Sequence, residues 1–358
     1  MTACQIGMTK MPDDKRAGVR IVDWYRANRR DLPWRQTRDP YAIWISEIML
    51  QQTQVDTVIP YWKRFLTRFP DLNTLAQADE ADVLSVWRGL GYYSRGRNLH
   101  QAAKQLMDEH GGVFPSELAK IKALPGIGEY TAAAVASIAF EQPHAAVDGN
   151  VIRVIARLLA FRDITDTTAA KREITGVVAQ MIPAGAAGDF TQGLMELGAL
   201  LCTPKQPQCG LCPMKDDCQA ALQGLQGVLP ERRKKTPVLE LQLVVAMIRK
   251  DDMILMEYRE RETMLRRMWG LPLAEMETPQ TGETALAAKY GLEFAVKSDS
   301  QKVVHSFTHR TWVMAVAEYA VKGELPPGLH WVRINALTDL AIPVAFQKAL
   351  LAFDQGIN

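Results

Sequence analysis

The segment Leu124-Pro-Gly-Ile-Gly-Glu-Tyr-Thr-Ala132 places two glycines between apolar stretches with helical spacing, which predicts a tight turn between two helices. Gly126 and Gly128 permit such a turn, and the second helix then begins with the positive end of its dipole exposed. This arrangement can bind a DNA phosphate without reading bases. An ordinary helix-helix turn would use the same glycines, so both interpretations stay open.

Apolar residues recur at helical spacing from Val19 to about Gly224, which predicts an all-helical first domain over residues 1–226. Prolines divide this region into segments, at Pro33, Pro70, Pro115, Pro125, Pro143, Pro183 and Pro204. Residues 227–237 carry four consecutive cations, Arg232 to Lys235, between two prolines, and we expect an exposed basic linker there.

The pattern of apolar residues changes after the linker, and residues 238–358 are predicted to form a second, α+β domain. Short β-branched and apolar runs predict strands at Leu239–Arg249, Met253–Arg259, Val303–His305 and Trp312–Ala320. Helical patterns are found near Gly282–Tyr290 and Val344–Asp354.

The composition of the 358 residues, 47% apolar and 23% charged, is that of a globular protein with sizeable cores. The longest apolar runs, such as Tyr130–Phe140 and Leu241–Ile248, are far shorter than the roughly 18 residues that a membrane span needs. The N-terminus has no apolar stretch of the kind found in signal peptides. We therefore expect a soluble intracellular protein. A net charge of +2 gives no indication of nucleic-acid binding, so any DNA contact must come from local groups.

Four of the five cysteines fall in the pattern C-x6-C-x2-C-x5-C, at Cys202, Cys209, Cys212 and Cys218. Four thiolates can hold zinc or a 4Fe-4S cluster, and structural zinc sites usually use two short C-x2-4-C pairs, whereas only Cys209 and Cys212 are so spaced here. The spacing therefore favours iron and sulfur over zinc, and over disulfides, which need an oxidising compartment. Lys205 and Lys215 lie in the same segment and could contact phosphate.

Two acidic residues stand out in the helical half. Asp148, in Val147-Asp-Gly-Asn-Val151, precedes a helical segment and could simply cap that helix. Glu47 lies among Ile and Leu side chains in Trp44-Ile-Ser-Glu-Ile-Met-Leu-Gln-Gln-Thr-Gln54. Burial would raise its pKa and let it act as a general acid, whereas on an exposed helix face it would be an ordinary solvated residue.

Together these motifs, with Leu32-Pro-Trp-Arg35 and Gly89-Leu-Gly-Tyr-Tyr-Ser-Arg95, resemble the MutY family of adenine DNA glycosylases within the endonuclease III-like helix-hairpin-helix superfamily. The resemblance spans nearly the whole chain. It implies a 4Fe-4S cluster, which we interpret as structural, and removal of adenine opposite 8-oxoguanine or guanine in double-stranded DNA. It also implies a monomeric, cytoplasmic and nucleoid-associated bacterial protein.

The resemblance further implies roles for individual residues. Glu47 would protonate the adenine at N7, and Asp148 would stabilise the sugar cation, with Tyr130 and Asn150 positioning that site. The flipped adenine would enter a pocket lined by Leu32, Trp34 and Arg35. Contacts to the gap and to the opposite base would come from Gln52, Thr53, Leu90 and Tyr92, although Leu90 and Tyr92 could instead belong to a helix core.

One position distinguishes this chain from endonuclease III-type enzymes, which carry a lysine nucleophile at the second residue after the hairpin's last glycine. Tyr130 stands there. Because Schiff-base chemistry needs an amine, we expect a monofunctional glycosylase that leaves an abasic site.

The second domain resembles a Nudix hydrolase, whose motif R-E-x-x-E-E-x-G binds magnesium. Alignment on Gly291 puts Ala285, Ala288 and Lys289 at the glutamate positions, so we expect no nucleotide hydrolysis. The family's F-S-H loop, which reads 8-oxoguanine, corresponds to Phe307, Thr308 and His309, with threonine replacing serine; Trp269-Gly-Leu-Pro272 is also similar. His305 and His309 have no evident third ligand, which argues against a metal site.

Other hypotheses are an endonuclease III-like glycosylase acting on pyrimidines, a DNA-binding redox sensor without catalysis, and hydrolysis of free nucleotides by the second domain. Tyr130 argues against the first, the presence of both Glu47 and Asp148 against the second, and Lys289 against the third.

Overall fold

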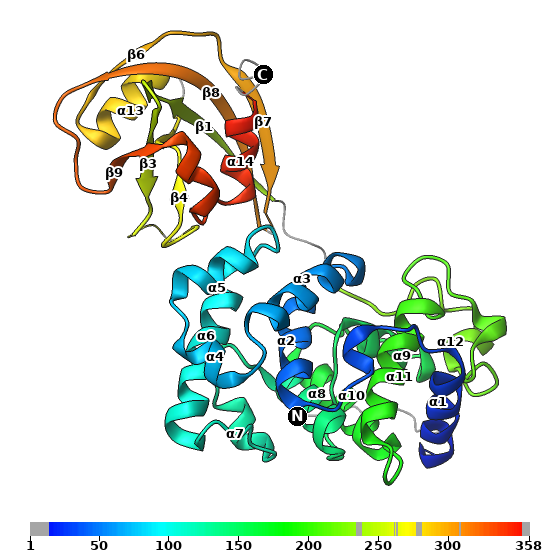
Figure 1. The fold of residues 1–358 in the computed structure, drawn as a ribbon. Helices are drawn as coiled ribbons and strands as arrows, with labels where there is room; N and C mark the ends of the chain where they lie inside the picture. The colour runs from blue at the N-terminus through cyan, green and yellow to red at the C-terminus, as the bar shows by residue number, and fades with distance from the viewer. Residues whose placement is uncertain are drawn as a thin grey trace, which may run out of the picture. The chain divides into compact units, whose positions relative to one another are not determined.

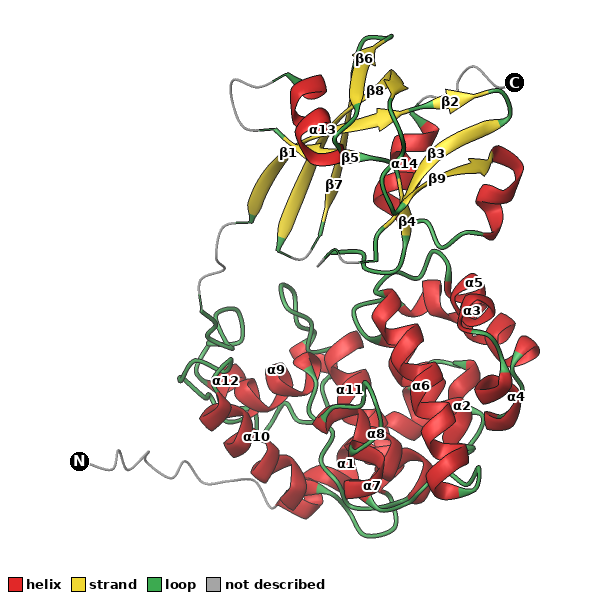
Figure 2. Cartoon of the chain, turned by 90° about the vertical axis from the view of Figure 1, so that its left-hand side faces the viewer, coloured by secondary structure: helices red, strands yellow, loops and turns green. Residues whose placement is uncertain are grey.

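The computed structural model describes residues 14–233, 238–260, 262, 264–276, 281–307 and 309–352. The chain divides into two compact units, one formed by Met1–Ala78 and Ser94–Lys234 and the other by Asp79–Tyr93 and Lys235–Asn358. The first unit is helical, and the strands of the described chain belong to the second (Figure 2). None of the helices in the described residues is long and apolar enough to cross a membrane.

The helical prediction for the first half of the chain is confirmed (Figure 1). The α-helices of the first unit are α1 Asp14–Asn28, α2 Pro40–Leu50, α3 Val55–Arg68, α4 Leu72–Gln77, α6 Tyr93–His110, α7 Leu118–Lys122, α8 Glu129–Phe140, α9 Gly149–Leu158, α10 Thr168–Met181, α11 Ala187–Leu200 and α12 Gln219–Leu222. Two short 3-10 helices are η1 Pro33–Arg35 and η2 Cys209–Leu211. Helix α5, Glu80–Trp87, is grouped with the second unit.

Helices α2 and α8 lie at the centre of the first unit and pack against each other. Asp39 caps α2 by accepting hydrogen bonds from the backbone amides of Tyr41 and Ala42, and Pro40 starts the helix, where a missing N–H costs nothing. Nine consecutive residues of α2 and eight of α8 are buried, so neither helix has a polar face. A carboxylate on α2 is therefore removed from water on all sides.

Helices α1, α9, α10 and α11 surround a second core that includes Ile21, Ile155 and Phe190. Two glycines of α11 let neighbouring helices approach its backbone. A Cβ atom at Gly193 would lie 2.9 Å from Cβ of Tyr25 on α1, and one at Gly198 would lie 2.6 Å from Cβ of Asn150 on α9. Both contacts are closer than carbon atoms allow, so glycine at these positions lets α1 pack on the middle of α11 and the start of α9 pack near its end.

The second unit contains a five-stranded and a four-stranded sheet with helices α13 Gly282–Tyr290 and α14 Val344–Leu351. In the first sheet, the order is β5-β1-β8-β6, with β7 also pairing with β8; β1 and β8 are parallel, with Leu239 opposite Arg310. In the second, β3 lies between β2, β4 and β9. The strands are β1 Leu239–Met247, β2 Arg249–Lys250, β3 Met253–Tyr258, β4 Trp269–Gly270, β5 Leu273–Glu275, β6 Glu293–Val296, β7 Gln301–Ser306, β8 Arg310–Lys322 and β9 Leu329–Arg333.

The α+β prediction for this unit is confirmed, and helix α13 has the predicted bounds. The predicted strand over Leu239–Arg249 is interrupted at Ile248, which separates β1 from β2. Strands β4, β5, β6 and β9 were not predicted, because runs of two to five residues are too short for a periodic pattern to be visible.

The predicted basic linker is not exposed along its whole length. Leu229 is buried, and its carbonyl oxygen accepts a hydrogen bond from Nε of Arg157 at 2.9 Å. The carbonyl oxygen of Glu231 accepts from the backbone amide of Thr165. Apolar and backbone contacts thus hold the segment to the helical unit up to Glu231, while residues 234–237 lie outside the described part.

Candidate active site and cluster segment

A cavity of about 1070 Å³ in the first unit brings together residues that are far apart in the sequence. Its lining includes the residues predicted for the reaction and for the adenine pocket, namely Leu32, Trp34, Arg35, Glu47, Tyr130, Asp148 and Asn150. Gln52 and Thr53, predicted to contact the gap and the opposite base, also line it. Leu32 and Trp34 are buried in its wall, and Trp34 packs edge-on against Trp62. The cavity is large enough to admit a purine, whose binding would displace water from the polar groups at its base.

Glu47 lies on the buried face of α2 with only 6% of its surface exposed. The Tyr130 hydroxyl donates a hydrogen bond to Oε2 of Glu47 at 2.8 Å. The pKa of Glu47 is raised to about 7, chiefly by burial and also by the nearby Asp148, while the Tyr130 hydrogen bond and Arg35 oppose the shift. This carboxyl can therefore carry a proton near neutral pH, as a general acid requires.

Asp148 both caps a helix and lines the cavity, so the two sequence interpretations are compatible. Its Oδ1 accepts from the backbone amide of Val151 at 2.7 Å, at the start of α9. Its Oδ2 accepts from Nδ2 of Asn150 at 2.9 Å. These two donors fix the orientation of the carboxylate toward the cavity that it shares with Glu47.

Glu196 is a site residue that the sequence reasoning missed. It is 1% exposed, and its carboxylate binds two arginines: Arg35 donates to both oxygens at 2.7 Å, and Arg30 donates at 2.9 and 2.6 Å. Burial alone would raise its pKa, but the two guanidinium groups lower it to about 2. The cavity therefore holds one carboxyl poised to carry a proton and another that stays ionised.

The signal that identified Glu47 was also present for Glu196, a lone acid among apolar residues in Gly193-Leu-Met-Glu-Leu197. Arg35, predicted as a pocket residue, is thereby fixed: its guanidinium lies between the Glu196 carboxylate and the ring of Tyr25, whose centroid is 5.4 Å away.

The turn between α2 and α3 carries the predicted DNA contacts Gln52 and Thr53. Gln52 has a positive φ of 58°, an uncommon conformation for a residue with a side chain. Buried Arg95 holds this turn by donating to the carbonyl oxygens of Ile48, Met49 and Gln51 at 2.5 to 2.9 Å. Satisfying the last carbonyls of α2 fixes the direction in which the turn leaves the helix.

Leu90 and Tyr92 differ in their environment. Leu90 is 6% exposed, so its side chain belongs to a core, as the simpler interpretation had it. Tyr92 is 47% exposed and has a positive φ of 47°, between Gly91 and helix α6. An aromatic ring is the kind of side chain that can stack on a base.

The predicted hairpin turn between α7 and α8 is formed as expected. Gly126 has a φ of 77°, and a Cβ atom there would lie 2.7 Å from Cβ of Asn98. Gly128 is the N-cap of α8, and nothing lies within 4 Å of the position that its Cβ would take. The start of α8 is therefore open on this side, which suits binding of a phosphate.

The four clustered cysteines are all unpaired and line one small cavity of about 30 Å³. Cys202, Cys212 and Cys218 pack on the core formed by α9 and α11, and Met214 between them is buried. Four thiols that face one space can hold a 4Fe-4S cluster, which the spacing of the cysteines also favours.

Cys212 provides a test of this cluster site. Burial raises the pKa of its thiol to about 11, so iron must displace its proton, and serine, which loses its proton still less readily, should not replace it. We expect Cys212→Ser to lose most of its iron and about 3 kcal/mol or more of stability, a fall in Tm of about 10 °C. Iron analysis and thermal unfolding measure both. Cys4→Ser is the matched control, and an iron content in Cys212→Ser equal to this control would contradict the assignment.

Arg153 connects the cysteine segment to the candidate catalytic carboxylate. Its Nε donates to the carbonyl oxygen of Cys202 at 2.7 Å, and its NH2 donates to Oδ1 of Asn150 at 2.7 Å and to the carbonyl oxygen of Gly198 at 2.9 Å. Asn150 in turn donates to Asp148. The sequence placed the cysteines far from the acids, but folding leaves only two side chains between Cys202 and Asp148.

In the second unit, Phe307 and His309 occupy the turn between β7 and β8, and Thr308 lies outside the described residues. The Phe307 ring packs edge-on between His305, at 4.6 Å between centroids, and Trp312, at 4.9 Å. His309 is exposed. The aromatic contacts hold Phe307 in place and leave the tip of the turn accessible.

Lys289 stands where the Nudix motif has a carboxylate, and its ammonium group forms ion pairs with two acids of this unit. Its Nζ lies 3.3 Å from Oε1 of Glu257 and 3.5 Å from Oε1 of Glu262, and it donates to the carbonyl oxygen of Leu273. Arg259 binds the other oxygen of Glu257 at 2.7 Å. The two acids in this corner are thus neutralised by side chains of the chain itself.

The helical fold, the hairpin and the paired acids in one cavity define a DNA glycosylase of the helix-hairpin-helix type with a cysteine cluster segment. Residues 45–180 match the HhH-GPD superfamily of base excision DNA repair proteins, residues 202–218 the iron-sulfur binding domain of endonuclease III, and residues 243–352 the NUDIX domain. A solved thermostable thymine-DNA glycosylase is 29% identical and has a TM-score of 0.54, covering 59% of this chain and 97% of its own.

Two relatives extend the similarity over both units. The adenine DNA glycosylase of Rattus norvegicus is 31% identical over 94% of this chain and 77% of its own length. That of Buchnera aphidicola subsp. Schizaphis graminum is 33% identical over 81% of this chain and 84% of its own length. The chain belongs to the adenine DNA glycosylase family, the MutY family, and is a hydrolase of base excision repair with a 4Fe-4S cluster segment.

Proposed function

We propose that this glycosylase hydrolyses the N-glycosidic bond of adenine mispaired with 8-oxoguanine or guanine, and that it leaves the DNA strand uncut. The observation that supports this most directly is the pair of acids in one cavity, with the pKa of Glu47 raised to about 7 by burial and Asp148 held by two donors. An acid for the base and an anion for the sugar are the two groups that N-glycoside hydrolysis needs.

The reaction begins when adenine leaves the duplex and enters the cavity against Leu32 and Trp34. Glu47 then transfers its proton to N7, so that the base departs as a neutral molecule. The Asp148 carboxylate stabilises the positive charge that develops on the sugar until water adds at C1′. Asn150 and Tyr130 orient the two acids through the hydrogen bonds that they make.

Strand cleavage by a Schiff base is not part of the proposal, because the hydroxyl at residue 130 cannot form an imine. Burial raises the pKa of Tyr130 well above its ordinary value, so it stays a neutral donor to Glu47. Recognition of 8-oxoguanine is assigned to Phe307, Thr308 and His309. The proposed domain bounds are 1–226 for the helical glycosylase domain, 227–237 for the basic linker and 238–358 for the lesion-binding domain. The protein is proposed to act as a monomer in the bacterial cytoplasm, associated with the nucleoid.

The second unit is proposed to bind the lesion without hydrolysing nucleotides. Ala285 and Ala288 have no ligand atoms, and Lys289 holds Glu257 and Glu262, the acids that a divalent cation would require. A magnesium-dependent pyrophosphohydrolase activity of the full chain on free nucleotides would contradict this assignment.

The deciding experiment is single-turnover excision on a duplex with one central 8-oxoguanine:adenine pair, analysed with and without alkali. We expect strand breaks only after alkali treatment, because hydrolysis leaves an alkali-labile abasic site. Breaks without alkali would indicate a lyase. The absence of breaks under either condition, with binding intact, would favour a redox sensor or a different target base. A duplex with guanine opposite adenine, run in parallel, gives the mismatch preference.

A further inference from the structure

The loop between β3 and β4 in the second unit, residues 259–268, has a rigid base. The backbone amide of Arg267 donates to the carbonyl oxygen of Arg259 at 2.8 Å, and the amide of Arg259 donates to that of Met268 at 3.0 Å. Arg259 and Met268 are 3% and 1% exposed. Positions 261 and 263 lie outside the described residues. The remaining loop is therefore attached to the core at both ends.

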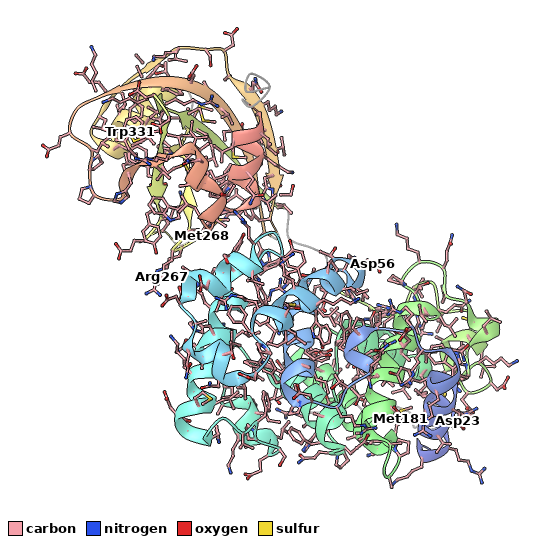
Figure 3. All side chains as sticks on the ribbon, in the orientation of Figure 1. Asp23, Asp56, Met181, Arg267, Met268 and Trp331 are labelled. Carbon is pink, nitrogen blue, oxygen red and sulfur yellow. The ribbon has the colours of Figure 1, made fainter. Side chains whose placement is uncertain are left out.

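The tip of this loop presents two arginines to solvent. Arg266 and Arg267 are both exposed, and Figure 3 shows Arg267 pointing away from the strands of its unit. Leu265 and Arg267 have positive φ angles of 56° and 57°. Left-handed backbone at residues with side chains costs on the order of 1 kcal/mol or more each, and a chain that keeps two such residues commonly does so at a functional site.

A third arginine lies beside the loop, on the turn proposed to read the lesion. NH1 of Arg310 is 3.8 Å from Sδ of Met264, and the carbonyl oxygen of Arg310 accepts from the amide of Phe307 at 2.7 Å. Arg310 is exposed. The loop at residues 264–267 and the turn at residues 307–310 thus form one edge of the second unit.

These three guanidinium groups have no carboxylate partner within the described residues. Glu257 and Glu262 are bound by Arg259 and Lys289, and Nε of Arg266 donates to the backbone carbonyl of Glu260, whose exposed carboxylate is the one acid left at the tip. Many exposed cations of the helical unit are instead paired, as in Arg38–Glu141, Lys120–Glu117 and Lys122–Glu129.

We infer that Arg266, Arg267 and Arg310 form a binding site for DNA phosphates beside the turn at Phe307 and His309. Guanidinium groups bind phosphate oxygens in pairs of hydrogen bonds, and contacts of this kind fix the register of a protein on a duplex. Three unpaired cations on one edge match the charge of a backbone, in a protein whose net charge of +2 provides no general attraction. The inference rests on the proposed function only in assigning the lesion to the adjacent turn.

The test is the salt dependence of DNA binding by the full-length protein with its cluster. The probe is a duplex with 8-oxoguanine opposite a 2′-fluorinated adenosine, in which fluorine opposes formation of the sugar cation and excision. Each phosphate contact contributes about 0.9 to the slope of log K against log salt. We expect the double variant Arg266→Gln/Arg267→Gln to lower the slope by about 1.8 and Arg310→Gln by about 0.9. Affinity at 0.1 M salt should fall on the order of tenfold in the double variant.

Arg333→Gln is the matched control, because Arg333 is exposed and pairs with Met253 at the end of β3 opposite the loop. It should keep the wild-type slope. The double variant Arg266→Lys/Arg267→Lys preserves both charges and should keep most of the wild-type slope. A double Gln variant that melts at the wild-type temperature yet keeps the wild-type slope would overturn the inference.

An undamaged duplex separates this inference from the proposed function. Phosphate contacts do not depend on the bases, so the slope change should appear there too. If the wild type fails to excise adenine and the slope still falls, the phosphate site stands and the proposed substrate is wrong. If the wild type excises adenine and the double Gln variant keeps the wild-type slope, the proposed substrate stands and the phosphate site is wrong.

Discussion

Asp148→Asn is expected to lower the single-turnover rate of adenine excision by about 10³-fold or more and to leave binding to the mismatch nearly unchanged. Asparagine has the shape of aspartate but no charge to place near the sugar cation, and loss of one preorganised electrostatic group at a reacting centre typically costs about 10²- to 10³-fold.

The local structure should survive the change, since asparagine can also cap a helix and its oxygen can accept from the amide of Val151. The contact with Asn150 is affected more, because two amide NH2 groups would then face each other. That mismatch should cost about 1 kcal/mol of stability, too little to unfold the protein. Binding to a duplex that contains 8-oxoguanine opposite adenine, followed by fluorescence anisotropy, measures what remains.

Asp71→Asn is a matched control for the loss of a capping carboxylate. Asp71 caps α4 by accepting from the amide of Thr74, and it is not among the residues that line the cavity. This variant should excise adenine at the wild-type rate. Excision by Asp148→Asn within tenfold of the wild type would refute the assigned role, and loss of binding together with excision would indicate a structural defect instead.

The comparison of sequence and structure shows which inferences a motif supports. Helical spacing and the glycine hairpin predicted the first unit, and local pattern identified Glu47 and Asp148 as candidates, because burial and capping are properties of a short segment. Lone acids in apolar segments are informative, as Glu196 demonstrates, but their state is set by distant partners. The pKa of Glu196 falls because Arg30 and Arg35 donate hydrogen bonds to its carboxylate, whereas Arg35 lowers the pKa of Glu47 only through its charge, which burial outweighs.

The contacts that the sequence could not predict join segments far apart in the chain. Arg153 reaches Cys202, which is 49 residues away, and Arg95 reaches the end of α2, 44 to 47 residues away. Neither residue lies in a pattern that names its partner. The short strands of the second unit were missed for a related reason, since β4 and β5 are defined by pairing with β3 and β1 rather than by their own sequence.

The second large effect is expected for Glu47→Gln, which should lower excision by about 10²- to 10⁴-fold. Glutamine can still accept the hydrogen bond from Tyr130, so the pocket keeps its shape, but it has no proton to transfer to adenine. Glu117→Gln, the same change at an exposed position that does not line the cavity, is the control and should retain full activity. A variant at Glu47 with a rate within tenfold of the wild type would eliminate it as the acid.

The same residue predicts the pH dependence of the chemical step. Because the proton must be present, the wild-type single-turnover rate should be constant well below pH 7 and fall about tenfold per unit well above it. The residual rate of Glu47→Gln should not fall in this way above pH 7. A wild-type rate that stays level from pH 6 to pH 9 would mean that another group donates the proton or that chemistry is not rate-limiting.

Stability should also fall as the pH rises, over the range between the two pKa values of Glu47. The pKa of Glu47 is raised from 4.5 to about 7 in the native state, so the native protein binds more protons than the unfolded chain between these values. Its free energy of unfolding therefore falls as the pH rises through this window, by about 3 kcal/mol in total, and the loss is complete above pH 7. Glu47→Gln removes this contribution and should unfold at a higher denaturant concentration than the wild type at pH 8, with little difference at pH 5. If Glu47→Gln is less active but more stable than the wild type at pH 8, then Glu47 lowers the stability of the native protein and is needed for catalysis.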